Sequence, residues 1–456
     1  MKKVFSFIII VACCFHLSAQ EAFESGLKAA DPAGVSGLTI SGYTRATGFI
    51  GIINHEEPTL KSLYNETSLK LKAKTGNWGQ AYTDVRFRVG TEYGTEFSAF
   101  DIREAYLDLY PGKLGFRIGK QVSPWGRADG WNPTDNLTPS NYFVRSPDHD
   151  DMRIGNFRIR GQYNPWDWLK LEADLAPWYT PSVYRFDLVE MPSFVTIGSP
   201  VHPGFKWDKT SFGTKLDLVF SGIEGSVSWF KGYDPLPALK PGVLPAPPFS
   251  DFKLELLQVP FRQQTIGADF ASVIFNTGIR GEIAYKIPEQ GDTIDPMIPN
   301  SEIQWVISID RELGPCRIIA GYLGKYVFNF MPADPPQAFD PAMISNPEVW
   351  PMLGSLLASQ IGYYNRILYD QTHEWSHSVL LRPSVTLFHE TLDVEISTLY
   401  NFTTEEYLLY PKVTYHLTDG LQATAGYQYY HGGDYSRFSW IKDAFNGPFF
   451  EFRLTF

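Results

Sequence analysis

The 456-residue sequence is poor in cysteine, carries more acidic than basic side chains and has no long apolar run beyond its N-terminus. Of its 3 cysteines, Cys13 and Cys14 lie in the N-terminal segment and Cys316 in the body of the chain, which excludes a disulfide scaffold. The formal net charge of −11 argues against a general nucleic-acid binder, because phosphate contacts require a basic surface. Outside the N-terminal segment no stretch reaches about 18 consecutive apolar residues, so we expect no membrane-spanning α-helix.

Apolar and aromatic residues are plentiful, at 44% and 15% of the chain, which excludes intrinsic disorder. The first 19 residues have the features of a secretory signal: Lys2 and Lys3, an apolar stretch over 4–17, and a small residue, Ala19, before the expected cut. A lipoprotein signal ending at Cys13 is the alternative, and the type of signal peptidase stays open. Either signal takes the protein out of the cytoplasm.

Short segments of alternating polar and apolar residues dominate the rest of the chain. In Gln80–Val89, Asp84, Arg86 and Arg88 alternate with Val85, Phe87 and Val89. In a strand these two sets lie on opposite faces, whereas a helix would need apolar positions every three to four residues. Similar alternation recurs at 156–163, 169–175, 279–286 and 392–397. The pattern predicts an all-β protein.

A soluble sandwich also alternates, but three features favour a membrane barrel. The polar faces are often charged at consecutive positions, as a water-filled lumen allows, and aromatic residues cluster at segment ends. The C-terminal Phe450, Phe452, Leu454 and Phe456 form one apolar face and resemble the signal that barrel-assembly machinery reads on bacterial outer-membrane proteins. We therefore expect one transmembrane antiparallel β-barrel with long outer loops.

The expected barrel has about 16–18 strands of roughly 9–13 residues. Tight turns are expected at 110–113, 221–222 and 419–420, facing the periplasm. Longer connections should face outward or enter the lumen. The expected strand centres are 44, 68, 85, 105, 118, 157, 172, 215, 227, 268, 281, 306, 321, 380, 396, 411, 425 and 452. The predicted organisation is a signal peptide over 1–19, a leader segment over 20–36 and the barrel over 37–456.

The block over 104–139 carries a family resemblance. Its Gly119-Lys120-Gln121, Trp125-Gly126, Asp129 and Asn132-to-Pro139 elements resemble large porin-like outer-membrane barrels of the alginate-export type and their uncharacterised relatives. In those proteins such a stretch ends a strand and starts a loop. The resemblance implies no particular substrate.

Two interpretations of this loop stay open. Asp129 and Asp135 can hold it as a structural latch, through backbone amides or by pairing with Arg127. Alternatively the loop folds inward and narrows the pore, exposing Arg127, Asp129 and Trp131 to solute. The constriction candidates are Lys120, Gln121, Trp125, Arg127, Asp129, Trp131 and Asp135.

Charged residues on the expected inward faces are candidates for pore lining and ion selectivity, because charges lining a pore set its ion preference. Simple solvation of the lumen with weak ion pairs is the alternative for each of them. The candidates are Arg86, Arg88, Arg117, Arg158, Arg160, Glu104, Asp108, Glu172 and Asp174, with Lys170 nearby.

Three other motifs require care. His373-Glu374-Trp375-Ser376-His377 matches the zinc-protease pattern, but a strand would place the two histidines about 13 Å apart, too far to share one zinc ion. Asp148-His149-Asp150-Asp151 is either a solvated loop or a surface calcium site. A helix-like stretch over 351–361 either packs on the mouth or plugs the lumen.

The predicted function is passive diffusion of small polar or anionic solutes through a charged lumen in the cell outer membrane, without a catalytic step, cofactor or metal. The expected partners are membrane lipid, barrel-assembly machinery, a small polar or oligosaccharide-like solute, and a second copy in a homo-oligomer. The alternatives are a surface adhesin and a barrel that assembles or modifies lipid or polysaccharide.

Overall fold

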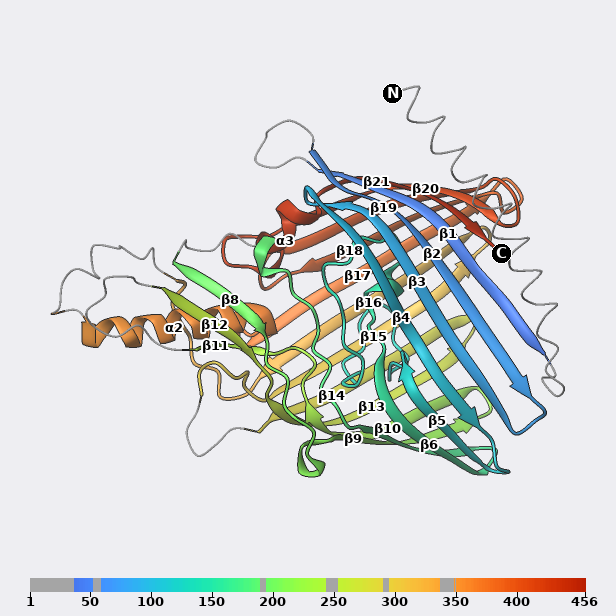
Figure 1. Cartoon of the computed structure of the whole chain (residues 1–456), viewed down its shortest axis with the longest axis horizontal. Coiled ribbons are helices and arrows are strands. Elements are labelled where there is room, and N and C mark those ends of the chain that lie inside the picture. The colour runs from blue at the N-terminus through green and yellow to red at the C-terminus, as the bar shows by residue number, and fades with distance from the viewer. Residues whose placement is uncertain are drawn as a thin grey trace.

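The structure is a computed structural model that describes residues 37–51, 59–188, 194–242, 253–289, 295–336, 348 and 350–456. Eighteen antiparallel strands form one sheet, and β1 pairs with both β2 and β21, which closes the sheet into a barrel (Figure 1). The predicted signal and leader segments over 1–36 lie outside the described residues. The barrel strands are β1 Leu38–Gly51, β2 Thr59–Thr75, β3 Gly79–Glu92, β4 Thr95–Leu109, β5 Leu114–Gln121, β6 Asn156–Trp166, β7 Leu169–Ala176, β9 Ser211–Phe220, β10 Ile223–Tyr233, β13 Arg262–Ile274, β14 Thr277–Pro288, β15 Glu302–Leu313, β16 Cys316–Val327, β17 Trp375–Leu387, β18 Leu392–Asn401, β19 Glu406–His416, β20 Leu421–His431 and β21 Gly447–Thr455.

The predicted fold class is confirmed, and every predicted strand centre lies within a barrel strand. Side chains alternate between a polar lumen and an apolar outer surface, as the pattern requires. In β3, for example, Asp84 is 2% exposed and faces inward, whereas Phe87 is 47% exposed and faces outward. A closed barrel also leaves no free sheet edge where strands pair along their full length.

The two ends of the barrel differ in their connections. The predicted tight turns at 110–113, 221–222 and 419–420 lie at one end, which also holds Leu38 and Phe456. The long connections lie at the other end, where β5 and β6, for example, are separated by 122–155. In Figure 1 the short-turn end is on the right and the long-loop end on the left.

The long loops build a small structure of their own beyond the rim. Parallel and antiparallel pairing joins β8 Val195–Pro200, β12 Leu254–Val259 and β11 Ala238–Pro241 into a three-stranded sheet. Helix α2, Trp350–Tyr369, lies beside this sheet in Figure 1, and its Leu357 and Ile361 are buried in one cluster with Leu239. The predicted 351–361 helix is therefore longer than expected and packs on the mouth.

Shorter helices complete the outer end. Helix α3, Arg437–Phe445, precedes β21, and single turns of 3₁₀ helix lie at η1 His149–Met152, η2 Phe186–Leu188 and η3 Trp207–Lys209. No described helix has both the length and the apolar character needed to span a membrane.

Candidate functional site: the lumen and its inward loop

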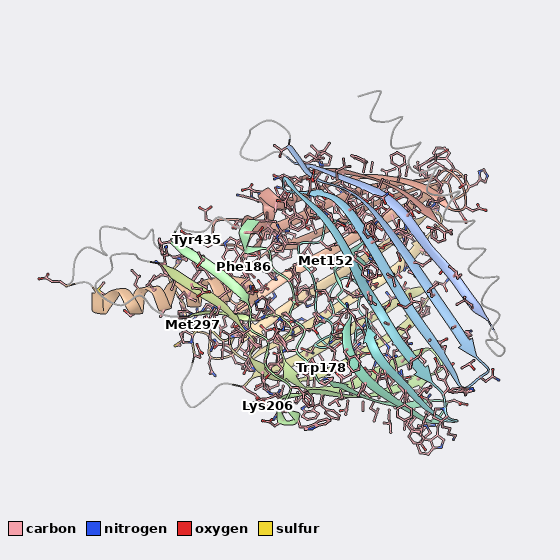
Figure 2. The ribbon with its side chains drawn as sticks, viewed as in Figure 1. Met152, Trp178, Phe186, Lys206, Met297 and Tyr435 are labelled. Atoms are coloured by element: carbon pink, nitrogen blue, oxygen red, sulfur yellow. The ribbon has the colours of Figure 1, made fainter. Side chains whose placement is uncertain are left out.

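The loop over 122–155, here called the inward loop, leaves the wall after β5 and fills part of the lumen before β6 begins. It makes hydrogen bonds and ion pairs to inward-facing side chains on strands from both sides of the barrel. Figure 2 shows Met152 of this loop within the outline of the barrel. The loop therefore folds inward and lies inside the lumen, as one of the two interpretations predicted.

The first part of the loop, 122–137, lies against an acidic section of wall; we call it the N-terminal arm. Arg127 forms an ion pair of 2.9 Å with Asp217 on β9 and a second one with Asp269 on β13. These carboxylates hold the pKa of Arg127 above its ordinary value against the opposing effect of burial. The arm thus neutralises negative charge on this wall.

Glu282 on β14 is the main attachment point of the N-terminal arm. Its carboxylate accepts hydrogen bonds from the backbone amides of Arg127 and Ala128, at 2.5 and 2.6 Å, and from Asn132 Nδ2 at 2.9 Å. Thr134 Oγ1 donates to the second carboxylate oxygen at 3.0 Å. One wall carboxylate therefore organises a whole turn of the loop.

Gly126 makes this attachment possible. Its φ of +101° is a conformation that favours glycine, and a Cβ atom there would lie 2.4 Å from Glu282 Oε1. Beyond Glu282, Asp129 pairs with Arg280, and a Cβ on Gly130 would lie 3.0 Å from Leu380 Cδ1 on β17. The Trp-Gly and Asp positions of the sequence block thus set the path of the arm across the lumen.

The second part of the loop, 141–153, is the C-terminal arm and lies against a basic wall. Asp151 forms ion pairs with Arg45, Arg86 and Arg103 at 2.8, 2.7 and 2.8 Å. Burial alone would raise the pKa of Asp151, but Arg45 and Arg86 hold it well below its ordinary value. The carboxylate is therefore ionised and acts as a counter-ion for the arginines.

The C-terminal arm is also tied to helix α3. The last carbonyls of this helix accept hydrogen bonds from Lys61 Nζ at 2.6 Å, Tyr93 Oη at 3.1 Å and Arg145 Nη1 at 3.5 Å. Cations near a helix C-terminus are favourable because the terminal carbonyls carry partial negative charge. Arg145, which belongs to the arm, also lies over the Phe49 ring at 4.3 Å. The arm is thus wedged between β1 and α3.

The structure places the predicted pore-lining residues on one continuous wall, but it also gives most of them partners. Arg117 binds Asp108 at 2.7 Å, and Arg160 donates to Ser123 Oγ at 2.6 Å. The remaining contacts are Arg88 to Arg145 O at 3.0 Å, Arg158 to Asp174 at 3.7 Å, Val122 N to Glu104 at 2.9 Å, Trp125 Nε1 to Glu172 at 3.0 Å and Lys170 to Glu172 at 3.3 Å.

The predicted constriction residues divide into two groups. Trp125, Arg127, Asp129, Trp131 and Asp135 lie in the N-terminal arm, with Trp131 39% exposed, and Lys120 and Gln121 are the last two residues of β5. Trp125 and Gln121 are buried, and Lys120 pairs with Asp101 at 3.2 Å. Asp135 accepts from Leu137 N at 3.3 Å, and burial raises its pKa to about 6 against the opposing field of Arg158. The pairing of Arg127 with Asp129 or Asp135 is wrong, because Arg127 reaches wall carboxylates instead.

Sequence reasoning missed the wall partners of the loop. Arg45, Asp217, Asp269 and Glu282 occupy polar positions of alternating strands, but nothing local shows which loop residue each one meets. Of the other motifs, Trp375–Leu387 is a strand as expected, and His377 Nδ1 lies 2.7 Å from Tyr322 Oη. The described residues contain no group of three or more potential metal ligands.

Comparison with known proteins identifies solved structures that share the fold of this chain. No protein-family model and no curated protein matches the chain. OccAB1 from Acinetobacter baumannii is 11% identical, with 93% of this chain and 97% of that chain covered and a TM-score of 0.53. A BenF-like porin from Pseudomonas fluorescens Pf-5 is 8% identical, with 93% and 99% covered and a TM-score of 0.53. OccK5 (OpdH) from Pseudomonas aeruginosa is 9% identical, with 93% and 99% covered and a TM-score of 0.50. The chain therefore has the fold of these porin structures.

Proposed function

We propose that the protein is an outer-membrane channel through which small polar or anionic solutes diffuse passively. The observation that carries this proposal is a closed barrel with an apolar outer face and a charged lumen that an inward loop narrows. An apolar band suits lipid, whereas charged side chains are tolerated on the water-filled inner face. No covalent step or cofactor is needed for such transport.

The lumen supports ion preference because charged side chains of both signs line it. Arg45, Arg86 and Arg117 project from β1, β3 and β5 beside Glu66, Asp84 and Asp108. Asp217, Asp269 and Glu282 project from β9, β13 and β14 with Lys215 and Arg280 nearby, and charges lining a pore set its ion preference. The pore-lining candidates named from the sequence stay our candidates for selectivity. The Trp-Gly block, which forms the N-terminal arm, supports a relationship to alginate-export-type barrels.

The outer surface supports insertion by barrel-assembly machinery. Phe450, Phe452, Leu454 and Phe456 are all exposed on the outer face, at 38, 53, 37 and 51%. An exposed apolar C-terminal strand offers both the assembly signal and a lipid contact. We further propose export by the N-terminal signal and association with a second copy of the chain.

A surface-binding role is the second candidate, and the outer sheet with α2 favours it. Leu239, Leu254 and Leu256 are at most 3% exposed, so this structure has a core of its own beyond the rim. A rigid platform of this kind suits binding of a partner at the cell surface. Removing it by proteolysis would abolish adhesion but leave conductance intact.

Planar-bilayer recording tests the proposed function. Residues 20–456 refolded in detergent should show the heat-modifiable migration of a barrel and give stable, ohmic single-channel steps with a measurable anion or cation preference. A folded barrel that never conducts would contradict the proposal and favour the surface-binding role.

A further inference from the structure

The barrel wall is lowest at β5–β7. β5 and β7 have 8 residues each and are the shortest strands of the barrel. A transmembrane strand needs about 9–11 residues, and eight residues tilted by about 45° rise only about 19 Å, less than the apolar band of about 25 Å. A span that is too short for its bilayer is accommodated by a thinner membrane or by association with another protein.

The neighbouring strand β4 has an unpaired edge on the same side of the barrel. β4 pairs with β5 only over Ala105–Leu109, and among the strands that the structure describes, Thr95–Ile102 pairs only with β3. A membrane-spanning length of about 9–11 residues, counted from Leu109, reaches past Ile102. Hydrocarbon cannot satisfy unpaired backbone groups, so this edge needs a cover that lipid tails do not provide.

The outer surface beside this edge is hollowed by a groove of about 840 Å³. Its floor is a row of directly paired residues, Gly161 on β6, Ala173 on β7 and Thr214 on β9. Phe116 on β5 and Trp229 on β10 pair with the two ends of this row and form the rims, each 37% exposed. Small residues thus lie between two large aromatic ones on the outer face.

Aromatic clusters at both ends of the same wall place the groove within the membrane. Near the short turns, the rings of Trp166 and Trp168 stack at 5.4 Å. Towards the long loops, Trp178 contacts Phe157 at 4.9 Å and Phe205 at 6.4 Å. Aromatic girdles mark the two interfaces of a barrel with its membrane, so the groove between them faces hydrocarbon.

The dimensions of the groove suit a protein surface. Four strand spacings separate its rims, about 19 Å along the wall, which is far wider than one acyl chain. Protein association inside a membrane depends on close packing, and small residues allow that close approach. In a two-fold contact each patch meets itself, so the rims of each copy can lie on the floor of the other.

We infer that the outer face of β5–β10 is the contact between two copies of this chain, related by a two-fold axis along the membrane normal. Phe116 and Trp229 of each copy pack over the Gly161-Ala173-Thr214 floor of the other. The contact replaces lipid at the short strands and places protein beside the free edge of β4. This inference rests on the association with a second copy proposed above and adds the face that carries it.

The mass of the barrel in detergent tests this inference. We expect two copies for the wild type and one copy for Ala173→Trp, because the larger side chain fills the floor of the groove. Ala320→Trp is the matched control: Ala320 pairs with the exposed Ile309 and Leu381 on the outer face of the far wall. It should leave two copies. Heat-modifiable migration shows that each variant is folded.

Cross-linking in lipid vesicles provides a second measurement that does not depend on Ala173→Trp. In a Cys316→Ser background, Ala173→Cys should be joined into a pair by a bifunctional maleimide, whereas Ile307→Cys on outer-facing β15 should not. Single copies in both measurements would overturn the inference and leave lipid in the groove, and equal cross-linking at both positions would also overturn it. A wild-type pair that does not conduct would contradict the proposed channel while supporting the contact.

Discussion

The two arms of the inward loop use opposite chemistry to hold opposite walls. The N-terminal arm brings Arg127 and a set of backbone amides to Asp217, Asp269 and Glu282. The C-terminal arm brings Asp151 to the arginines of β1, β3 and β4. Each arm therefore brings a charge or hydrogen-bond donors of the opposite sign to the wall residues that it meets.

This difference shows how one loop can supply partners for charged side chains on two walls of a barrel. Attachment through backbone amides depends on the conformation of the loop and on one wall carboxylate, so substitution of the wall residue Glu282 should best detach the N-terminal arm. Attachment of the C-terminal arm depends on one loop side chain, so substitution of Asp151 should best detach it. The following predictions separate the two arms, from the largest effect to the smallest.

Glu282→Ala should have the largest effect, because it removes the shared acceptor of the N-terminal arm. At least two buried backbone amides lose their partner, which weakens docking of the arm by about 3 kcal/mol. We expect larger single-channel conductance and faster proteolysis within 122–137. Unchanged conductance and protection would contradict the role of Glu282, and Glu289→Ala at the rim serves as the control.

Asp151→Asn should release the C-terminal arm and remove the counter-ion that Arg45, Arg86 and Arg103 share. Glu66, Asp84 and Glu451 still face these arginines, so we expect a smaller loss, about 2 kcal/mol. The reversal potential in a salt gradient should shift toward anion selectivity. The same substitution at exposed Asp150 should not shift it, and an equal shift in both variants would refute the counter-ion role.

Gly126→Ala should weaken only the N-terminal arm. A Cβ atom would meet the Glu282 carboxylate, and the positive φ would be strained, at a cost of about 1–2 kcal/mol. Hydrogen exchange should rise within 122–137 and stay constant within 141–153. Gly112→Ala, in a short turn with open space around it, controls for strain elsewhere. Increased exchange in both arms would show that they are not independent.

A change of pH should have the smallest effect, through Asp135. Its pKa in the folded loop, about 6, lies above the ordinary value of 3.8, so the folded loop binds the proton more tightly. Docking of the N-terminal arm should therefore strengthen as pH falls from 7 to 5 and weaken as pH rises through 6. Open-channel noise should follow this change in the wild type and lose its pH dependence in Asp135→Asn.

The sequence predicted the wall of the barrel far better than its interior. Alternation in segments such as Gln80–Val89 fixes strands and faces locally, so all strand centres were correct. The contact between Glu282 and the loop could not be predicted in this way. Glu282 and Arg127 are 155 positions apart, and the Glu282 carboxylate accepts from backbone amides, which every residue type except proline has. Helix α2 was underestimated because its last turns are held by distant groups: Asn365 accepts from Leu239 N at 2.8 Å.

The strands of the outer sheet were missed for a related reason. β8, β11 and β12 are only 4 to 6 residues long, and they pair across large separations within proline-rich connections. A strand of that length shows little alternation on its own. Its pairing partners, which decide whether it forms, leave no local mark in the sequence.

Block by an anionic thiol reagent tests most directly the claim that the inward loop is held mainly by β1–β4 and β9–β14 and makes fewer polar contacts with β15–β19. In a Cys316→Ser background, single cysteines at Ser397 on β18 and at buried Ser68 on β2 place the same thiol on the two sides. The account predicts rapid block of conductance through Ser397→Cys and little block through Ser68→Cys. Rapid block through Ser68→Cys with an unaffected Ser397→Cys channel would contradict it.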